Sequence, residues 1–200
     1  MDRFSFFFAF YGLILGLAVA ELLSGFAGLV RARALRRIEA QTGLLALFTF
    51  IAICATWIDA WDTLQAVSLD FAGLWAPIMI ATCYFLAATV VFPRDAAEYD
   101  RLAQYFAERK RFVVAMLLAA ELFVFTTFLG SFIQTFHTKP AVFWLYEVPY
   151  NVMIKGSMVA LLFVRSRRAN LILLAFLILL FLIPYWDNGA IGAWIHQHFD

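Results

Sequence analysis

The chain has 200 residues, of which 64% are hydrophobic and only 14% are charged. A soluble globular domain has roughly half of its residues apolar and about a quarter charged, so this composition excludes an ordinary soluble domain and indicates a membrane protein. The net charge of +1 comes without a basic tract interleaved with aromatic residues, so we expect no binding to nucleic acid.

Six long apolar runs, separated by short polar segments, account for nearly the whole chain. Each run is close to the roughly 20 residues that a helix needs to cross a bilayer. We therefore predict an all-α integral membrane protein that forms a single domain over residues 1–200 and has six transmembrane helices. The predicted helices cover residues 5–30, 42–61, 71–92, 112–135, 142–164 and 169–186.

Small residues recur every four positions along the first run, at Gly12, Gly16, Ala20, Ser24 and Gly28. Small side chains at this spacing let helix backbones approach closely in lipid, where hydrophobic burial does not drive association. We predict that this helix packs tightly inside the protein; the alternative is that it forms the seam of a dimer.

The start of the first run also resembles a signal peptide, because the apolar residues 4–17 are followed by small residues at 18–20. Cleavage there would leave Glu21 as the new amino terminus. The apolar run, however, continues to Val30 and ends at an arginine-rich segment. This continuation favours an uncleaved first transmembrane helix.

The segment between the third and fourth runs predicts a short amphipathic helix. Tyr99, Leu102 and Phe106 recur at helical spacing and form one apolar face, while charged residues occupy the remaining positions. A helix of this kind lies on the membrane surface, with its basic residues near anionic lipid.

The basic residues predict the orientation of the chain, because Lys and Arg near helix ends are retained on the cytoplasmic side. Twelve of the 15 basic residues follow the first, third or fifth run: Arg31, Arg33, Arg36, Arg37, Arg94, Arg101, Arg109, Lys110, Arg111, Arg165, Arg167 and Arg168. We therefore expect a protein of a bacterial-type cytoplasmic membrane with both termini on the non-cytoplasmic side.

The six predicted helices divide into two halves of three, which enter the membrane in opposite senses. Such 3+3 inverted repeats are recurrent in transporters and place the substrate site near the midplane. Five identities at an offset of 100 residues, among them Glu21 with Glu121, favour such a repeat. Chance remains the alternative explanation, because both segments are rich in leucine and alanine.

Three ionisable residues form a predicted charged layer near the bilayer midplane. Glu21, Glu121 and Lys155 each lie ten residues from an arginine at the cytoplasmic end of their run. Ten helical residues span about 15 Å, half of a hydrocarbon core of about 30 Å. Charge at this depth is costly and usually marks a functional site. The alternative is a Glu121–Lys155 ion pair that only fixes the packing of the helices.

Polar residues on the outer side of this layer predict a water-accessible vestibule. Glu147 and Asn151 precede Lys155 at intervals of four, so the three side chains form one polar ridge. Thr127 on the fourth run and Asp59 on the second add polar groups at outer depths. Tyr84 of the third run reaches midplane depth and can hydrogen-bond to the charged layer.

We predict a small transporter or an ion or proton pathway that uses the charged layer. Two glutamates for one lysine leave one carboxyl group without a cationic partner, and a carboxyl that exchanges a proton inside the membrane suits a proton-coupled carrier. The ion or solute is not identified by the sequence.

The alternative is a non-transporting membrane subunit or scaffold that docks a partner protein, or a second copy, through the first or the sixth helix. The sequence contains no recognisable catalytic motif, so we do not expect an enzyme. We also expect no cofactor and no metal site, because the histidines near the end stand in a tryptophan-rich segment typical of a membrane interface.

Cysteine labelling tests the predicted topology. In a variant without Cys54 and Cys83, the substitutions Asp2→Cys and Asp200→Cys should each give a thiol that reacts with a membrane-impermeant maleimide in intact cells, because both termini are predicted to lie outside. Arg101→Cys should react only after the membrane is permeabilised. The opposite labelling pattern would reverse the predicted orientation.

Overall fold

The computed structural model describes residues 3–33, 38–63, 65, 71–187 and 189–199. Of these residues, 93% are helical and none lies in a strand, which confirms the all-α prediction. Five helices are long and apolar enough to cross a membrane, and they indicate a membrane-embedded protein. These are α1 (Arg3–Arg31), α2 (Ala40–Thr63), α3 (Phe71–Val91), α4 (Leu102–Thr138) and α7 (Arg167–Asp187).

The fifth predicted span is helical as far as Phe163, but it is built from three consecutive pieces. These are α5 (Pro140–Val142), the π-helical turn η4 (Phe143–Glu147) and α6 (Val148–Phe163). Pro149 explains the wider turn, because its ring has no N–H to offer the carbonyl group of Leu145 and would clash with that group in a regular α-helix. α6 alone has 16 residues, fewer than the roughly 20 needed to cross a bilayer.

The segment between α3 and α4 differs from the prediction of a separate amphipathic helix. A 3-10 helix, η3 (Ala96–Arg101), leads directly into α4, which continues for 37 residues. The predicted apolar face is correct, since Tyr99, Leu102 and Phe106 are all buried. Residues 102–129 contain neither glycine nor proline, so nothing interrupts the helix at the predicted boundary. At 1.5 Å per residue, α4 is about 55 Å long and extends beyond a hydrocarbon core of about 30 Å.

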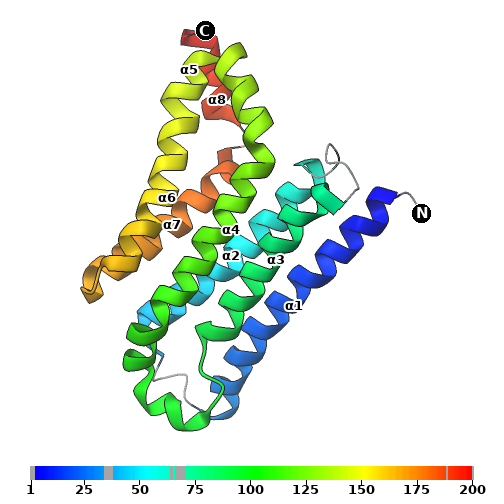
Figure 1. Ribbon diagram of the computed structural model, residues 1–200. Coiled ribbons are helices and arrows are strands. Elements are labelled where there is room, and N and C mark those ends of the chain that lie inside the picture. Colours follow the sequence, from blue (N-terminus) through cyan, green and yellow to red (C-terminus); the bar gives the residue numbers. More distant parts are fainter. Residues whose placement is uncertain (1–2, 34–37, 64, 66–70, 188, 200) are drawn as a thin grey trace.

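Each of the long helices packs against at least one other long helix. α3 lies between α1 and α4, α2 packs against α7, and α6 contacts both α4 and α7. The terminal helix α8 (Ala190–Phe199) packs against α5. Figure 1 shows that α1 begins and α8 ends at the same end of the bundle, opposite the turns that follow α1, α3 and α6.

The packing does not confirm the predicted 3+3 inverted repeat. α1 packs extensively against α3, but α4 and α7, the corresponding pair in the second half, have no comparable contact among the described residues. α2 likewise packs against α7, whereas the corresponding pair, α6 and α3, has no comparable contact among the described residues. The two halves therefore pack differently.

The small residues of α1 do not form one continuous seam inside the chain. Gly12 and Gly28 each face an aromatic side chain from another segment. The other three members of the predicted stripe are exposed: Gly16, Ala20 and Ser24. Gly25, outside the predicted stripe, also packs closely: an added Cβ would lie 2.9 Å from the Cβ of Phe92, just after α3.

Two glycine substitutions test this contact between α1 and the end of α3. Gly25→Ala should lower the free energy of unfolding by about 1–3 kcal/mol, because the new methyl group overlaps the rigid base of Phe92. Gly16→Ala, for which nothing lies within 4 Å of the added Cβ, should be neutral or slightly stabilising because alanine favours the helix. Unfolding in detergent measures both, and equal stabilities would contradict the packing of α1.

Candidate functional site

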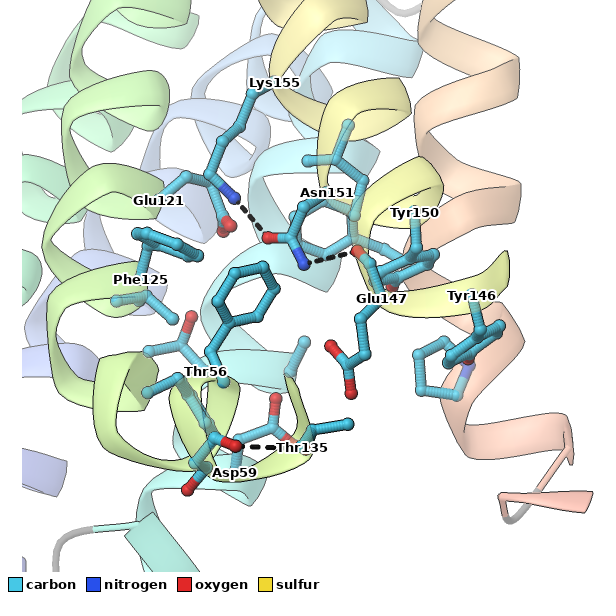
Figure 2. A pocket seen from close by; sticks show the side chains of 18 of the residues that line it. Thr56, Asp59, Glu121, Phe125, Thr135, Tyr146, Glu147, Tyr150, Asn151 and Lys155 are labelled. Atoms are coloured by element: carbon cyan, nitrogen blue, oxygen red, sulfur yellow. Dashed lines mark hydrogen bonds between the residues drawn. The ribbon is translucent and has the colours of Figure 1, made fainter. Parts of the chain in front are cut away.

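A cavity of about 430 Å³ lies among α2, α4, α7 and the continuous helical segment formed by η4 and α6. Figure 2 shows the side chains that converge on it. Among the described residues, its ionisable carboxyl and amine groups are those of Asp59, Glu121, Glu147 and Lys155. The cavity extends along α4 from Glu121 to Thr135, a distance of about 21 Å at helical rise. It therefore connects the predicted midplane with the outer end of the bundle.

Glu121 lies at the inner end of this cavity and is buried. The hydroxyl group of Tyr84 on α3 donates a hydrogen bond to its carboxyl Oε1 at 3.3 Å. The same hydroxyl lies 2.8 Å from the hydroxyl of Thr56 on α2. Because Tyr84 has only one hydroxyl proton, Thr56 donates to Tyr84 whenever Tyr84 donates to Glu121. This hydroxyl chain joins three helices at the carboxyl group.

Lys155 is held by its own helix and by an aromatic ring of α4. Its ammonium group donates to Asn151 Oδ1 at 2.6 Å, and its Nζ lies 4.9 Å from the ring centre of Phe125. Asn151 in turn donates to the backbone carbonyl of Glu147 at 2.9 Å. The polar ridge predicted from the four-residue spacing is therefore present.

Glu121 and Lys155 point into the same cavity, as Figure 2 shows. The structure gives them no direct ion pair: in the described part of the chain, the hydrogen-bond partner of Lys155 is Asn151 and that of Glu121 is Tyr84. A ligand that enters the cavity can therefore reach both groups without first breaking a salt bridge.

Tyrosines fix the outer part of the cavity. The hydroxyl of Tyr185 lies 3.0 Å from Asp59 Oδ1 and 3.1 Å from the carbonyl oxygen of Ala55. Tyr150 donates to the carbonyl oxygen of Leu180 at 3.0 Å and stacks on Tyr146 at 5.7 Å between ring centres. These contacts tie η4 to α6, α6 to α7, and α7 to α2.

The structure brings together two of the three residues of the predicted charged layer. Glu21 is not at the cavity, because its carboxyl group forms an ion pair with Arg94 at 3.1 Å, where α1 meets the segment after α3. Arg94 follows α3 at the predicted cytoplasmic end, and its long side chain reaches toward Glu21 along the surface. Glu21 therefore does not lie beside Glu121 and Lys155, although the sequence predicts the same depth in the membrane for all three residues.

The predicted vestibule residues occupy three different places. Glu147 and Asn151 line the cavity, and Tyr84 lies behind Glu121 as its hydrogen-bond partner. Thr127 lines a separate small hollow, and its hydroxyl is bonded to the carbonyl of Val124 at 2.7 Å.

Sequence reasoning missed Tyr150 and Tyr185 as wall residues. The available signal was the position of Tyr150 one residue before Asn151 on the polar ridge, and that of Tyr185 directly after Pro184.

Comparison with known proteins supplies no relative from which a function could be transferred. No protein-family model, no curated protein and no solved structure matches this chain. The cavity and its chemistry are therefore the basis for a functional proposal.

Removing single hydroxyl groups tests the chain that holds Glu121. Tyr84→Phe should lower the free energy of unfolding by about 1–3 kcal/mol, because it leaves the buried groups of Glu121 and Thr56 without their partner. Tyr146→Phe is the matched control. Its hydroxyl makes no hydrogen bond among the described residues, so the change should stay within about 0.5 kcal/mol. Denaturation in detergent compares the two, and equal losses would argue against the chain.

Proposed function

We propose that this protein is a membrane transporter or ion pathway for a small solute or ion, with the cavity around Glu121 and Lys155 as its binding site. The observation that carries the proposal is the buried carboxyl group at the inner end of a cavity of about 430 Å³. This volume lies within the range of small-molecule sites. Ionisable side chains in apolar helices around a cavity typically mark the path of an ion or substrate.

The proposal includes six membrane crossings, one of them made by residues 140–163. Irregular backbone is tolerated inside a membrane where it lines a cavity. The π turn η4 supplies such backbone in the outer part of the cavity, and Glu147 at its end lines the cavity. Six crossings also agree with the positions of α1 and α8 at one end of the bundle in Figure 1.

The lining of the cavity favours a proton or a cationic solute. Its three carboxyl groups outnumber the single amine of Lys155 among the described residues. Aromatic faces, which attract cations, complete much of the wall. These rings belong to Phe125, Phe128, Phe132, Tyr146, Tyr150, Phe181 and Tyr185. The contact of Lys155 with Phe125 illustrates the interaction that a bound cation would make.

Glu121 is the group that we propose to exchange a proton. As a carboxylate it accepts a hydrogen bond from the hydroxyl of Tyr84, and that hydroxyl accepts a hydrogen bond from Thr56. As a carboxylic acid it can donate to Tyr84, which then donates to Thr56, so the same chain satisfies both protonation states by reversing its direction. A group with partners in both states can take up and release a proton without a large rearrangement.

The second candidate function is that of a docking subunit. It is favoured by the exposure of Gly16, Ala20 and Ser24 on α1, where a helix of another chain could approach closely. α7, the other predicted docking helix, buries one face inside the chain, including Leu174 and Leu177. Its opposite face remains exposed and includes the apolar residues Ile172, Leu179 and Trp186.

Flux measurements separate the two functions. Protein reconstituted in liposomes should carry protons or a coupled organic cation down an imposed gradient, as followed by an internal pH dye. Glu121→Gln should abolish this flux, because the amide keeps size and hydrogen bonding but cannot exchange a proton.

Glu21→Gln is the matched control for this experiment. It makes the same chemical change in a helix that does not line the cavity, so the flux should be retained. Equal loss in both variants would contradict a specific role for Glu121. Liposomes that stay tight in proton and cation gradients would favour the docking subunit.

A further inference from the structure

A second cavity, of about 590 Å³, lies at the predicted cytoplasmic end of the bundle. It is formed by the first turns of α2 and α7, the amino-terminal part of α4 and the turn after α6, and it shares no lining residue with the cavity around Glu121. The side chains at its floor are buried: Gln41, Phe106, Lys110 and Asn170. The charged side chains at its rim are exposed: Glu108, Arg111, Arg165 and Arg167.

Lys110 is a buried cation at the floor, with 5% of its surface exposed. Its ammonium group donates to the backbone carbonyl of Val164 and, at 3.1 Å, to Asn170 Oδ1. An ammonium group has three donors, so these two bonds, the ones it makes within the described residues, leave one donor for a ligand. A buried positive charge with spare hydrogen-bonding capacity is a strong feature of an anion site.

A hydrogen-bonded network holds this floor in place. Asn170 Nδ2 donates to Gln41 Oε1 at 3.0 Å, and Gln41 Nε2 donates to the carboxylate of Glu39 at 3.2 Å. The network connects α4, α7 and α2, and it orients the oxygen of Asn170 toward Lys110. The position of the ammonium group is thus fixed before any ligand binds.

Two helix amino termini meet at the same cavity. α2 begins at Ala40 and α7 at Arg167, and Gln41 and Asn170 in their first turns both line the floor. Amino-terminal turns carry partial positive charge and unpaired N–H groups, which favour phosphate. Their effect adds to that of the four cationic side chains.

Two carboxylates lie near this charge, Glu108 in the described lining and Glu39 beside Gln41, and they do not cancel it. Glu108 accepts a hydrogen bond at 2.8 Å from Gln104, on its own helix. Arg111 donates a hydrogen bond from its Nε to the carbonyl of Leu162, so the two terminal nitrogens of its guanidinium group remain as donors for a ligand. The described lining thus contains one carboxylate, that of Glu108, and four cationic side chains, those of Lys110, Arg111, Arg165 and Arg167.

We propose that this basic cavity binds a phosphate group, carried either by the headgroup of an anionic phospholipid or by a soluble phosphate compound. Basic pockets between helices on the cytoplasmic side are suited to anionic headgroups. Phe163, directly before the lining residue Val164, is exposed and is available for an acyl chain. The site is separate from the proposed transport cavity and does not depend on its function.

Binding of defined probes to the full-length protein in a neutral detergent tests this proposal. The probes are short-chain phosphatidylglycerol and inorganic phosphate, with short-chain phosphatidylcholine as the comparison, because this lipid is zwitterionic and has no net charge. The parent protein should bind at least one anionic probe at a single saturable site. Removing two exposed rim charges, with Arg165→Gln and Arg167→Gln together, should weaken this binding by at least about tenfold.

The matched control is the double variant Arg101→Gln with Arg109→Gln. It removes the same charge on the same predicted side of the membrane, from exposed residues outside the cavity, and its binding should stay within about twofold of the parent. The four substituted side chains, two at the rim and two in the control, are all exposed, so both double variants should fold.

The two probes distinguish the sources of the phosphate. Binding of phosphatidylglycerol that phosphate does not displace would identify a lipid site, and displacement by phosphate would identify a site for soluble compounds. Either result supports the proposal. A parent protein without saturable binding of either probe, or a control variant that loses as much affinity as the rim variant, would overturn it.

Discussion

The burial of polar and ionisable side chains inside an apolar helical protein is the constraint on which this structure depends. A carboxyl group removed from water must be hydrogen-bonded, because its desolvation is otherwise not compensated. Glu121 meets this requirement through Tyr84 and Thr56, which belong to two other helices. The need of one side chain on α4 thus fixes the relative positions of α2, α3 and α4.

The same constraint acts at the predicted cytoplasmic end. Lys110 is buried there and donates hydrogen bonds to Val164 and Asn170, while Asn170 also donates to Gln41. These bonds hold α4 to the turn between α6 and α7 and to the start of α2. Two hydrogen-bonded networks, one at the proposed transport cavity and one at the basic cavity, therefore both connect α2 with α4. α1 lies outside both networks and is joined to the rest by apolar packing and by the Glu21–Arg94 ion pair.

An irregular helix shapes the outer part of the proposed transport cavity. Pro149 prevents a regular α-helix at η4, and the wider turn presents Glu147 to the cavity. Aromatic side chains of α4, α6 and α7 fill the remaining wall, so the cavity combines polar groups that fix orientation with surfaces that suit an organic cation. The local irregularity and the proposed binding site are thus parts of one arrangement.

The amino-acid sequence by itself determined where the helices lie and which residues share a face. Apolar runs near 20 residues located the long helices to within a few positions, except at the start of α4, and did not predict α8. The four-residue spacing predicted the ridge of Glu147, Asn151 and Lys155. Tertiary structure alone decided the partners: Glu121 meets Tyr84, and Glu21 meets Arg94. Spacing along a helix fixes the depth and direction of a side chain, because both follow from helical geometry. Which helices become neighbours depends on packing between residues far apart in the chain, and that packing is not encoded in any one segment.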